Sequence, residues 1–204
     1  MSEVPQRFSD SKRLLARFRA VCSEWRPSSP GFSVGPRVDE RLPADYLEFI
    51  RLVGSGEGFV GTSFIRLYPL EQIASATSAY AIELYLPRHL LLGSDGGGNA
   101  LLFDCSAPDT SVLVQPFIPL DPEYATTRFP SWSAFLEACF AVPVGFQPRL
   151  ANPNTHGLEV HERHPIVLGG DPTDPGNKML LPPPTHAEAC VFFNKLVQAV
   201  RNKQ

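Results

Sequence analysis

The 204-residue chain lacks several features that would assign it to a function class at once. No apolar run approaches the roughly 20 residues that a membrane-spanning helix needs. No Cys-x-x-Cys pair is present, which argues against a zinc knuckle. No signal peptide is evident, so we expect reduced thiols in a cytoplasmic protein that does not act at a membrane. The four cysteines are spread along the chain: Cys22, Cys105, Cys139 and Cys190.

The chain also lacks the charge and the motifs of nucleic-acid-binding proteins and hydrolases. Its net charge of −3 argues against a nucleic-acid-binding face, because phosphates are neutralised by clustered Lys and Arg. There is no Gly-x-Ser-x-Gly motif, and no histidine occurs in the first 88 residues. A composition that is 43% hydrophobic and 19% charged fits a globular domain with a full core. We therefore predict a folded protein that is not an enzyme and holds no cofactor.

The chain is organised around Leu90–Cys105, where two short apolar runs flank a glycine-rich turn at Asp95–Asn99. Asp and Gly allow the backbone to reverse cheaply, and the runs are too short for helices. We predict an antiparallel hairpin at the centre of a sheet, with helices on either side. A phosphate-binding loop is the alternative, but it requires a helix and a Lys-Ser/Thr pair after the glycines.

Apolar spacing and turn residues predict the flanking elements. The predicted helices are a first one capped at Ser9–Ser11 and extending to Trp25, then Pro43–Val53 ended by Gly54, Pro69–Tyr80, and one after Pro130 that carries Trp132 and Phe135. The predicted strands are Phe59–Tyr68, interrupted at Gly61, and Ser111–Phe117. The fold class is therefore α+β: a twisted, largely antiparallel sheet with helices packed against it.

The order of these pieces resembles the SUKH superfamily over about Leu14–Val142. A helix opens with Leu42-Pro43-x-x-Tyr46 and ends at Gly54-x-Gly-Glu-Gly; a Gly-x-Asp-Gly-Gly-Gly hairpin and a Trp/Phe-rich helix follow. This superfamily includes a fungal regulator of cell-wall synthesis and bacterial immunity proteins. The resemblance implies a non-enzymatic domain that binds a protein, often a nuclease toxin, and blocks it. A regulatory scaffold that binds an endogenous partner is the alternative.

Acidic residues beside the predicted turns are candidate contacts to a basic partner, because charge complementarity favours recognition. They are Glu57, Asp95 and Asp109. Asp95 also fits the role of a turn former, and Asp104 that of a strand-end cap. Candidate aromatic anchors are Phe59, Phe64 and Tyr124.

Residues 143–204 differ in character from the predicted SUKH-like domain at 1–142. This proline-rich extension holds four of the five histidines. Thr185-His186-Ala187-Glu188 has the pattern of a capping box, which predicts a final helix that packs on the same body. The apolar face predicted for that helix is Ala189, Phe193, Leu196 and Val200.

The extension also resembles His-Asn-His nucleases with a ββα-metal fold, through His164, Asn177 and His186. In such nucleases one His activates water and another helps to hold the metal. Arg163 stands where those nucleases carry a metal ligand, and a cation there would repel the ion. We therefore predict no metal site, and treat Gly169–Asn177 as turns. A bound but non-catalytic metal and an active nuclease remain alternatives.

Overall fold

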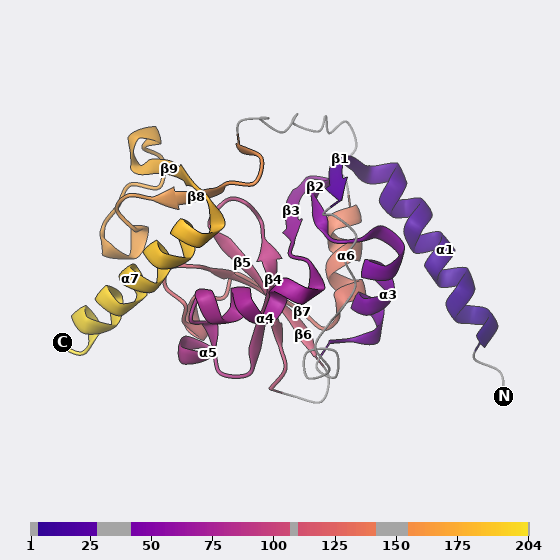
Figure 1. Ribbon diagram of the computed structural model, residues 1–204, viewed down its shortest axis with the longest axis horizontal. Helices are drawn as coiled ribbons and strands as arrows, with labels where there is room; N and C mark the ends of the chain where they lie inside the picture. The colour runs from indigo at the N-terminus through magenta and orange to yellow at the C-terminus, as the bar shows by residue number, and fades with distance from the viewer. Residues whose placement is uncertain (1–3, 28–41, 107–109, 142–154, 204) are drawn as a thin grey trace.

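The computed structural model describes residues 4–27, 42–106, 110–141 and 155–203. Within these ranges, seven antiparallel strands form one sheet whose spatial order follows the chain (Figure 1). The predicted α+β fold with a largely antiparallel sheet is confirmed. The strands are β1 (Cys22–Pro27), β2 (Gly56–Val60), β3 (Ser63–Leu67), β4 (His89–Ser94), β5 (Asn99–Asp104), β6 (Ser111–Pro116) and β7 (Thr127–Phe129).

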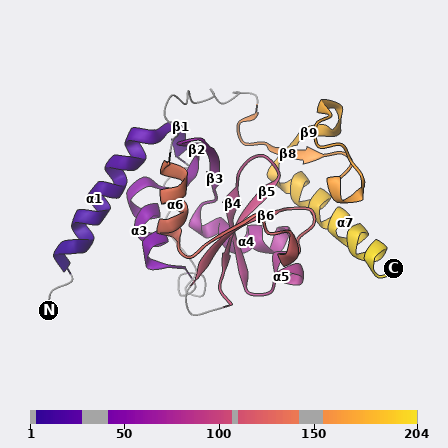
Figure 2. The same cartoon turned by 180° about the vertical axis from the view of Figure 1, so that it is seen from behind.

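Helices cover both faces of this sheet, and the ends of the chain lie at opposite ends of the molecule (Figures 1 and 2). One face carries α1 (Val4–Val21), α3 (Ala44–Val53) and α6 (Trp132–Phe140), and the other carries α5 (Ile82–Tyr85) and α7 (Pro183–Arg201). Between them, α4 (Leu70–Ala79) contacts both apolar cores. A sheet covered on both faces needs strands that are apolar on both sides.

The predicted central hairpin is β4–β5, which is buried on both faces. Leu90 and Leu92 enter one core, and Leu91 between them enters the other. The turn is held by Asp95, whose carboxylate accepts the backbone N–H of Gly97 at 2.8 Å and of Asn99 at 2.9 Å. Asp95 therefore has the turn-forming role that its position predicts.

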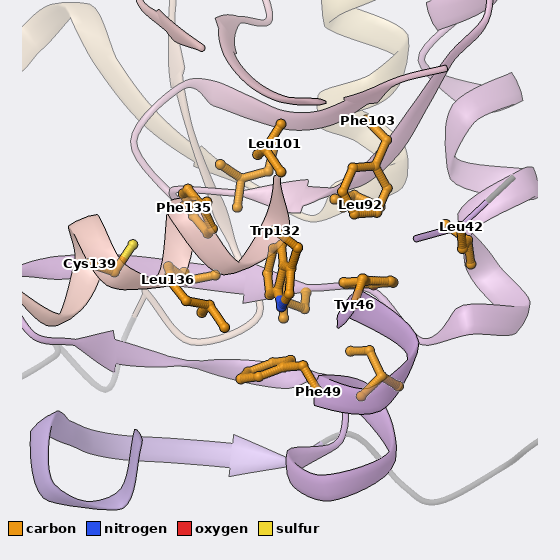
Figure 3. Close-up of a cluster of buried hydrophobic side chains, with 14 of the residues drawn as sticks. Leu42, Tyr46, Phe49, Leu92, Leu101, Phe103, Trp132, Phe135, Leu136 and Cys139 are labelled. Carbon is orange, nitrogen blue, oxygen red and sulfur yellow. The ribbon is translucent and has the colours of Figure 1, made fainter. Parts of the chain in front are cut away.

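The larger core is centred on Trp132, which is fully buried between α3, α6 and the sheet (Figure 3). Its ring meets Tyr46 at a centroid distance of 4.9 Å and Phe49 at 5.2 Å, both edge to face. The Leu-Pro-x-x-Tyr helix and the Trp/Phe-rich helix, which are about ninety residues apart in sequence, thus supply one aromatic cluster.

The first helix is shorter at its C-terminal end than predicted. It ends at Val21, and Cys22–Pro27 forms the edge strand β1 instead, paired with β2. Trp25 still reaches the core, because its ring packs edge to face on Phe18 at 5.3 Å. Periodicity alone could not separate the two outcomes, since strand and helix both bring Trp25 to the same core.

The last helix differs from prediction in its start and in the face that it buries. It begins at Pro183 after the cap residue Pro182, so Thr185 lies inside the first turn and caps nothing. The predicted face is wrong: Leu196 and Val200 are exposed. Asn194 explains the rotation, because its side chain accepts the N–H of Leu120 at 2.8 Å and donates to the carbonyl of Phe117 at 2.8 Å. The buried residues are His186, Ala187, Cys190, Asn194 and Val197.

The extension adds a two-stranded sheet of β8 (Glu159–Glu162) and β9 (Lys178–Leu181) next to the central hairpin. It approaches where β3 and β4 pair over only two residue pairs, Arg66 with Ser94 and Leu67 with Gly93. The backbone N–H of Val160 donates to the carbonyl of Gly96 in the hairpin turn at 3.3 Å. The short β3–β4 junction is thus the place where extension and sheet meet.

Gly93 is the residue that allows β3 and β4 to approach at this junction. A Cβ at Gly93 would lie 1.8 Å from the carbonyl oxygen of Arg66, whereas a Cβ at Gly97 would meet only the Asp95 side chain at 3.4 Å. We expect Gly93→Ala to lower the free energy of unfolding by about 1–3 kcal/mol or more. Gly97→Ala, the matched control, should change it by less than about 0.5 kcal/mol. Urea unfolding of the full chain measures both, and equal effects would contradict this role for Gly93.

Candidate functional site

The three acidic residues predicted to meet a partner lie in different settings. Glu57 on β2 is only 7% exposed, and its carboxylate accepts the Nε–H of Arg66 at 2.6 Å. Asp95 is half-buried and bonded within the hairpin turn. Asp109 lies outside the described residues. The partner-binding role of all three stays a prediction, but Glu57 has little surface to offer in this conformation.

Glu57 belongs to a buried ion network that joins the sheet to the extension. The guanidinium of Arg66 on β3 donates to Glu57, to Glu159 on β8 and to the carbonyl of Leu158. The Ser94 hydroxyl on β4 donates to the two oxygens of Glu159 at 2.8 and 3.0 Å. Burial raises the pKa of Glu159, while Arg66 and Ser94 act in the opposite direction. One cation therefore holds two carboxylates from distant parts of the chain in place.

In the extension, β8, β9 and α7 follow one another in a β–β–α order, as the nuclease resemblance implies. The three residues of that motif do not converge, however. Asn177 bonds the backbone of His164 through both ends of its amide, at 2.8 and 2.9 Å, and the carbonyl of Asp171 at 3.0 Å. The ring of His164 is exposed, and His186 is buried. Asn177 therefore closes a turn, which is the role that the turn interpretation gives it.

His186 lies instead beside two residues that are not part of the nuclease-like motif. His161 of β8 and Cys190 of α7 are buried with it, and the possible ligand atoms of the three lie within 4.8 Å of one another. Among the described residues, this is the group of His, Cys, Asp and Glu side chains that could share an ion, and His164 is not part of it. The four-residue spacing of His186 and Cys190 places them on one helix face, a signal already present in the sequence.

The outer face of α7 carries large apolar side chains that face solvent. Phe192 is 62% exposed, Leu196 40% and Val200 43%, and they recur every four residues along the helix. We call these three residues the α7 stripe. Of the predicted aromatic anchors, Tyr124 is exposed near the C-terminal end of α7, where Arg201 lies 5.2 Å from its ring centroid. Phe59 and Phe64 are half-buried against each other.

The fold and these surfaces define the class of protein. The chain has a two-sided α+β domain with an exposed apolar stripe, and none of its described helices is both long and apolar enough to cross a bilayer. A model of the SMI1 / KNR4 family (SUKH-1) matches residues 37–138, half of the chain. The chain belongs to this family, which confirms the SUKH resemblance. No curated protein matches the chain.

Family membership gives the general functional class of the chain. At the family level the chain is a protein-binding module, and members are generally non-catalytic. The matched residues include β2 to β7, α3, α4, α5 and most of α6. They do not include β8, β9 or α7, so the extension carries features beyond the matched part.

The buried ion network makes a prediction about stability. Arg66→Met removes the guanidinium that the two buried carboxylates share, and leaves Glu57 with its contacts to His156 and Gly157, which should cost about 3–5 kcal/mol of unfolding free energy. Arg17→Met is the control, because both side chains of the Arg17–Glu137 pair are exposed and its loss should cost less than about 1 kcal/mol. Chemical denaturation followed by far-UV circular dichroism measures both.

A triple variant separates charge imbalance from lost packing. Combining Arg66→Met with Glu57→Gln and Glu159→Gln removes both stranded charges, so it should be more stable than Arg66→Met alone. A triple variant less stable than the single one would show that the network contributes by its bonds and not by its charge balance.

Proposed function

We propose that this chain is a non-enzymatic immunity protein that binds a cognate toxin domain in the cytoplasm and covers its active surface. The observation that carries the proposal is the α7 stripe on a domain of the SUKH-1 family. Apolar side chains exposed at regular spacing are typical of protein-binding sites, and aromatic residues tend to dominate the binding energy. Phe192, the most exposed of the three, is the expected anchor.

The division of the chain supports this assignment of roles. We propose that residues 1–142 form the SUKH-like domain and that residues 143–204 are an extension that presents the stripe. The inner face of α7 is occupied by contacts to Phe117 and Leu120 at the end of β6, so its outer face is left for a partner. A stable complex buries about 800 Å² on each partner, so the surface must reach beyond these three side chains.

The states of the buried thiols and of His89 also fit a protein that acts by steric occlusion. Burial raises the pKa of the Cys139 thiol to about 11 and also raises that of Cys190, so neither buried thiol is a ready nucleophile. His89, the histidine of the family-matched part, is buried and bonded to the carbonyl of Pro87 at 3.0 Å. A binding function needs no reactive side chain, and it uses the rigid surface as it stands.

The proposal is tested by protection of cells. The tagged chain is cross-linked in its native host, the captured protein is identified, and that protein is then expressed in a susceptible host with and without this chain. We expect a toxin whose lethality the chain suppresses. Phe192→Glu combined with Leu196→Glu should abolish protection and weaken the purified complex at least about 30-fold, the effect of losing a contact of about 2 kcal/mol.

The control is Leu52→Glu, because Leu52 is a similarly exposed apolar residue, 38% accessible, but lies on α3 away from α7. It should leave protection and affinity unchanged. Circular dichroism and thermal unfolding must show that each variant folds. Capture of a non-toxic endogenous protein would instead favour a regulatory scaffold. Full protection by the α7 double variant would show that the contact surface lies outside the α7 stripe.

A further inference from the structure

A buried cluster of two imidazoles and a thiol lies where β8 crosses α7. His161 comes from β8, while His186 and Cys190 are one turn apart on the inner face of α7. The Nε2 atom of His186 lies 3.5 Å from the Sγ atom of Cys190. The rings of His161 and His186 meet edge to face, with centroids 5.2 Å apart. Such polar side chains are rarely gathered in a core without a reason.

The hydrogen bonds of His186 direct one ring nitrogen toward Cys190. The Tyr80 hydroxyl lies 2.9 Å from Nδ1 of His186 and donates to the carbonyl of Pro183 at 3.3 Å. In the tautomer of His186 that carries its proton on Nδ1, the hydroxyl accepts a hydrogen bond from Nδ1–H, and Nε2 presents its lone pair toward Cys190. An imidazole that donates through one nitrogen to a neighbouring oxygen and is free at the other is the usual arrangement of a metal-binding histidine.

His161 supplies the second observation. Its Nε2 atom is buried and has no hydrogen-bond partner within the described parts of the chain. Leaving a buried polar atom unpaired is destabilising, so such an atom calls for an explanation. It lies in a cluster whose ligand atoms are all within 4.8 Å of one another.

We propose that His161, His186 and Cys190 bind one zinc ion. Zinc takes imidazole nitrogen at about 2.0–2.1 Å and thiolate sulfur at about 2.3 Å in tetrahedral geometry, which places the two ligand atoms about 3.5 Å apart. The Nε2–Sγ distance of 3.5 Å between His186 and Cys190 already matches. The ligand atom of His161 lies within 4.8 Å of the other two ligand atoms. Binding of a shared ion would shorten these two distances by about an ångström. Two imidazoles with one thiolate suit zinc better than magnesium or calcium.

The protonation states of the cluster are compatible with an ion. Burial lowers the pKa of His186 to about 3 and also lowers that of His161, so both rings are neutral at pH 7, as metal ligands must be. Burial, helped by Glu159, raises the pKa of the Cys190 thiol. The ion displaces that proton to solvent and stabilises the thiolate, and the nearby Glu159 carboxylate offsets the remaining positive charge.

The site has an open side. A pocket of about 440 Å³ is lined by His161 and His186 together with the hairpin turn at Gly97 and Gly98 and the loop at Phe117. Three protein ligands leave the fourth tetrahedral position of the ion for water or another small ligand, and this pocket is where that ligand would lie. The site is distinct from the α7 stripe, because its residues occupy the opposite face of the helix.

Metal titration of the full chain tests the proposal. The purified protein is stripped with a chelator and titrated with zinc in competition with a chromophoric chelator, and in parallel with cobalt(II). We expect one ion per chain, a cobalt spectrum with tetrahedral intensity, and a near-ultraviolet thiolate-to-cobalt charge-transfer band. His161→Gln and Cys190→Ser should weaken zinc binding at least about 100-fold, and Tyr80→Phe about 10–100-fold, since it alters only the orienting hydrogen bond.

Matched controls come from the same chain. Cys139→Ser changes another buried cysteine, and His164→Gln changes the histidine of the nuclease-like motif; neither should alter the affinity or the charge-transfer band. If Cys190→Ser does not fold, the wild-type cobalt spectrum decides alone. Failure to bind zinc stoichiometrically, cobalt binding without the thiolate band, or an equal loss in His164→Gln would each overturn the proposal.

Discussion

The placement of the extension depends on one buried cation, the guanidinium of Arg66. It draws Glu57 from β2 and Glu159 from β8 to the short β3–β4 junction, where Ser94 completes the bonding of Glu159. Alternate residues of a strand share a face, so fixing Glu159 also fixes His161 two positions later. The same strand segment therefore carries the charge that fastens the extension and the imidazole that faces α7. A buried network of this kind contributes less to net stability than to holding a single arrangement, because desolvation offsets much of the attraction between the charges.

The sheet explains why such a junction exists. β4 and β5 are apolar on both sides and are covered on both faces, so the hairpin is a rigid centre for everything else. Towards β3 the ladder is short, and α4 compensates for the missing pairing: the Thr77 hydroxyl accepts the backbone N–H of Leu91 at 2.9 Å. Because β3 and β4 pair over only two residue pairs, a further segment can pack at their junction without disrupting either hydrophobic core. The extension packs at this junction.

Local patterns predicted the elements of the sheet domain well, because their apolar periodicity and their turn residues agree. The hairpin at Asp95–Asn99, the helix ended by Gly54 and the Trp132 helix are examples. The extension was harder to predict, because its arrangement is set by single long-range bonds. Asn194 rotates α7 by bonding the backbone near Phe117, and no apolar pattern records that contact. His164 fits the nuclease-like motif by its spacing, whereas the cluster forms from His161, which the strand period turns inward, and from the His186/Cys190 spacing on the helix.

The two faces of α7 depart from the usual division of a surface helix, because polar side chains are buried and large apolar ones are exposed. His186, Cys190 and Asn194 are buried together with Ala187 and Val197, whereas the side chains of the α7 stripe are exposed. Hydrophobic burial alone does not account for the buried polar side chains, so specific partners must hold them inward. Asn194 has such partners in the chain, and His186 has Tyr80, but the Nε2 atom of His161 has none in the described residues. An ion would complete the inner face and a protein partner would cover the outer one. Because the two faces do not share residues, a substitution can remove the function of one face and leave the other intact. The two faces are coupled only in that both depend on the folded position of α7.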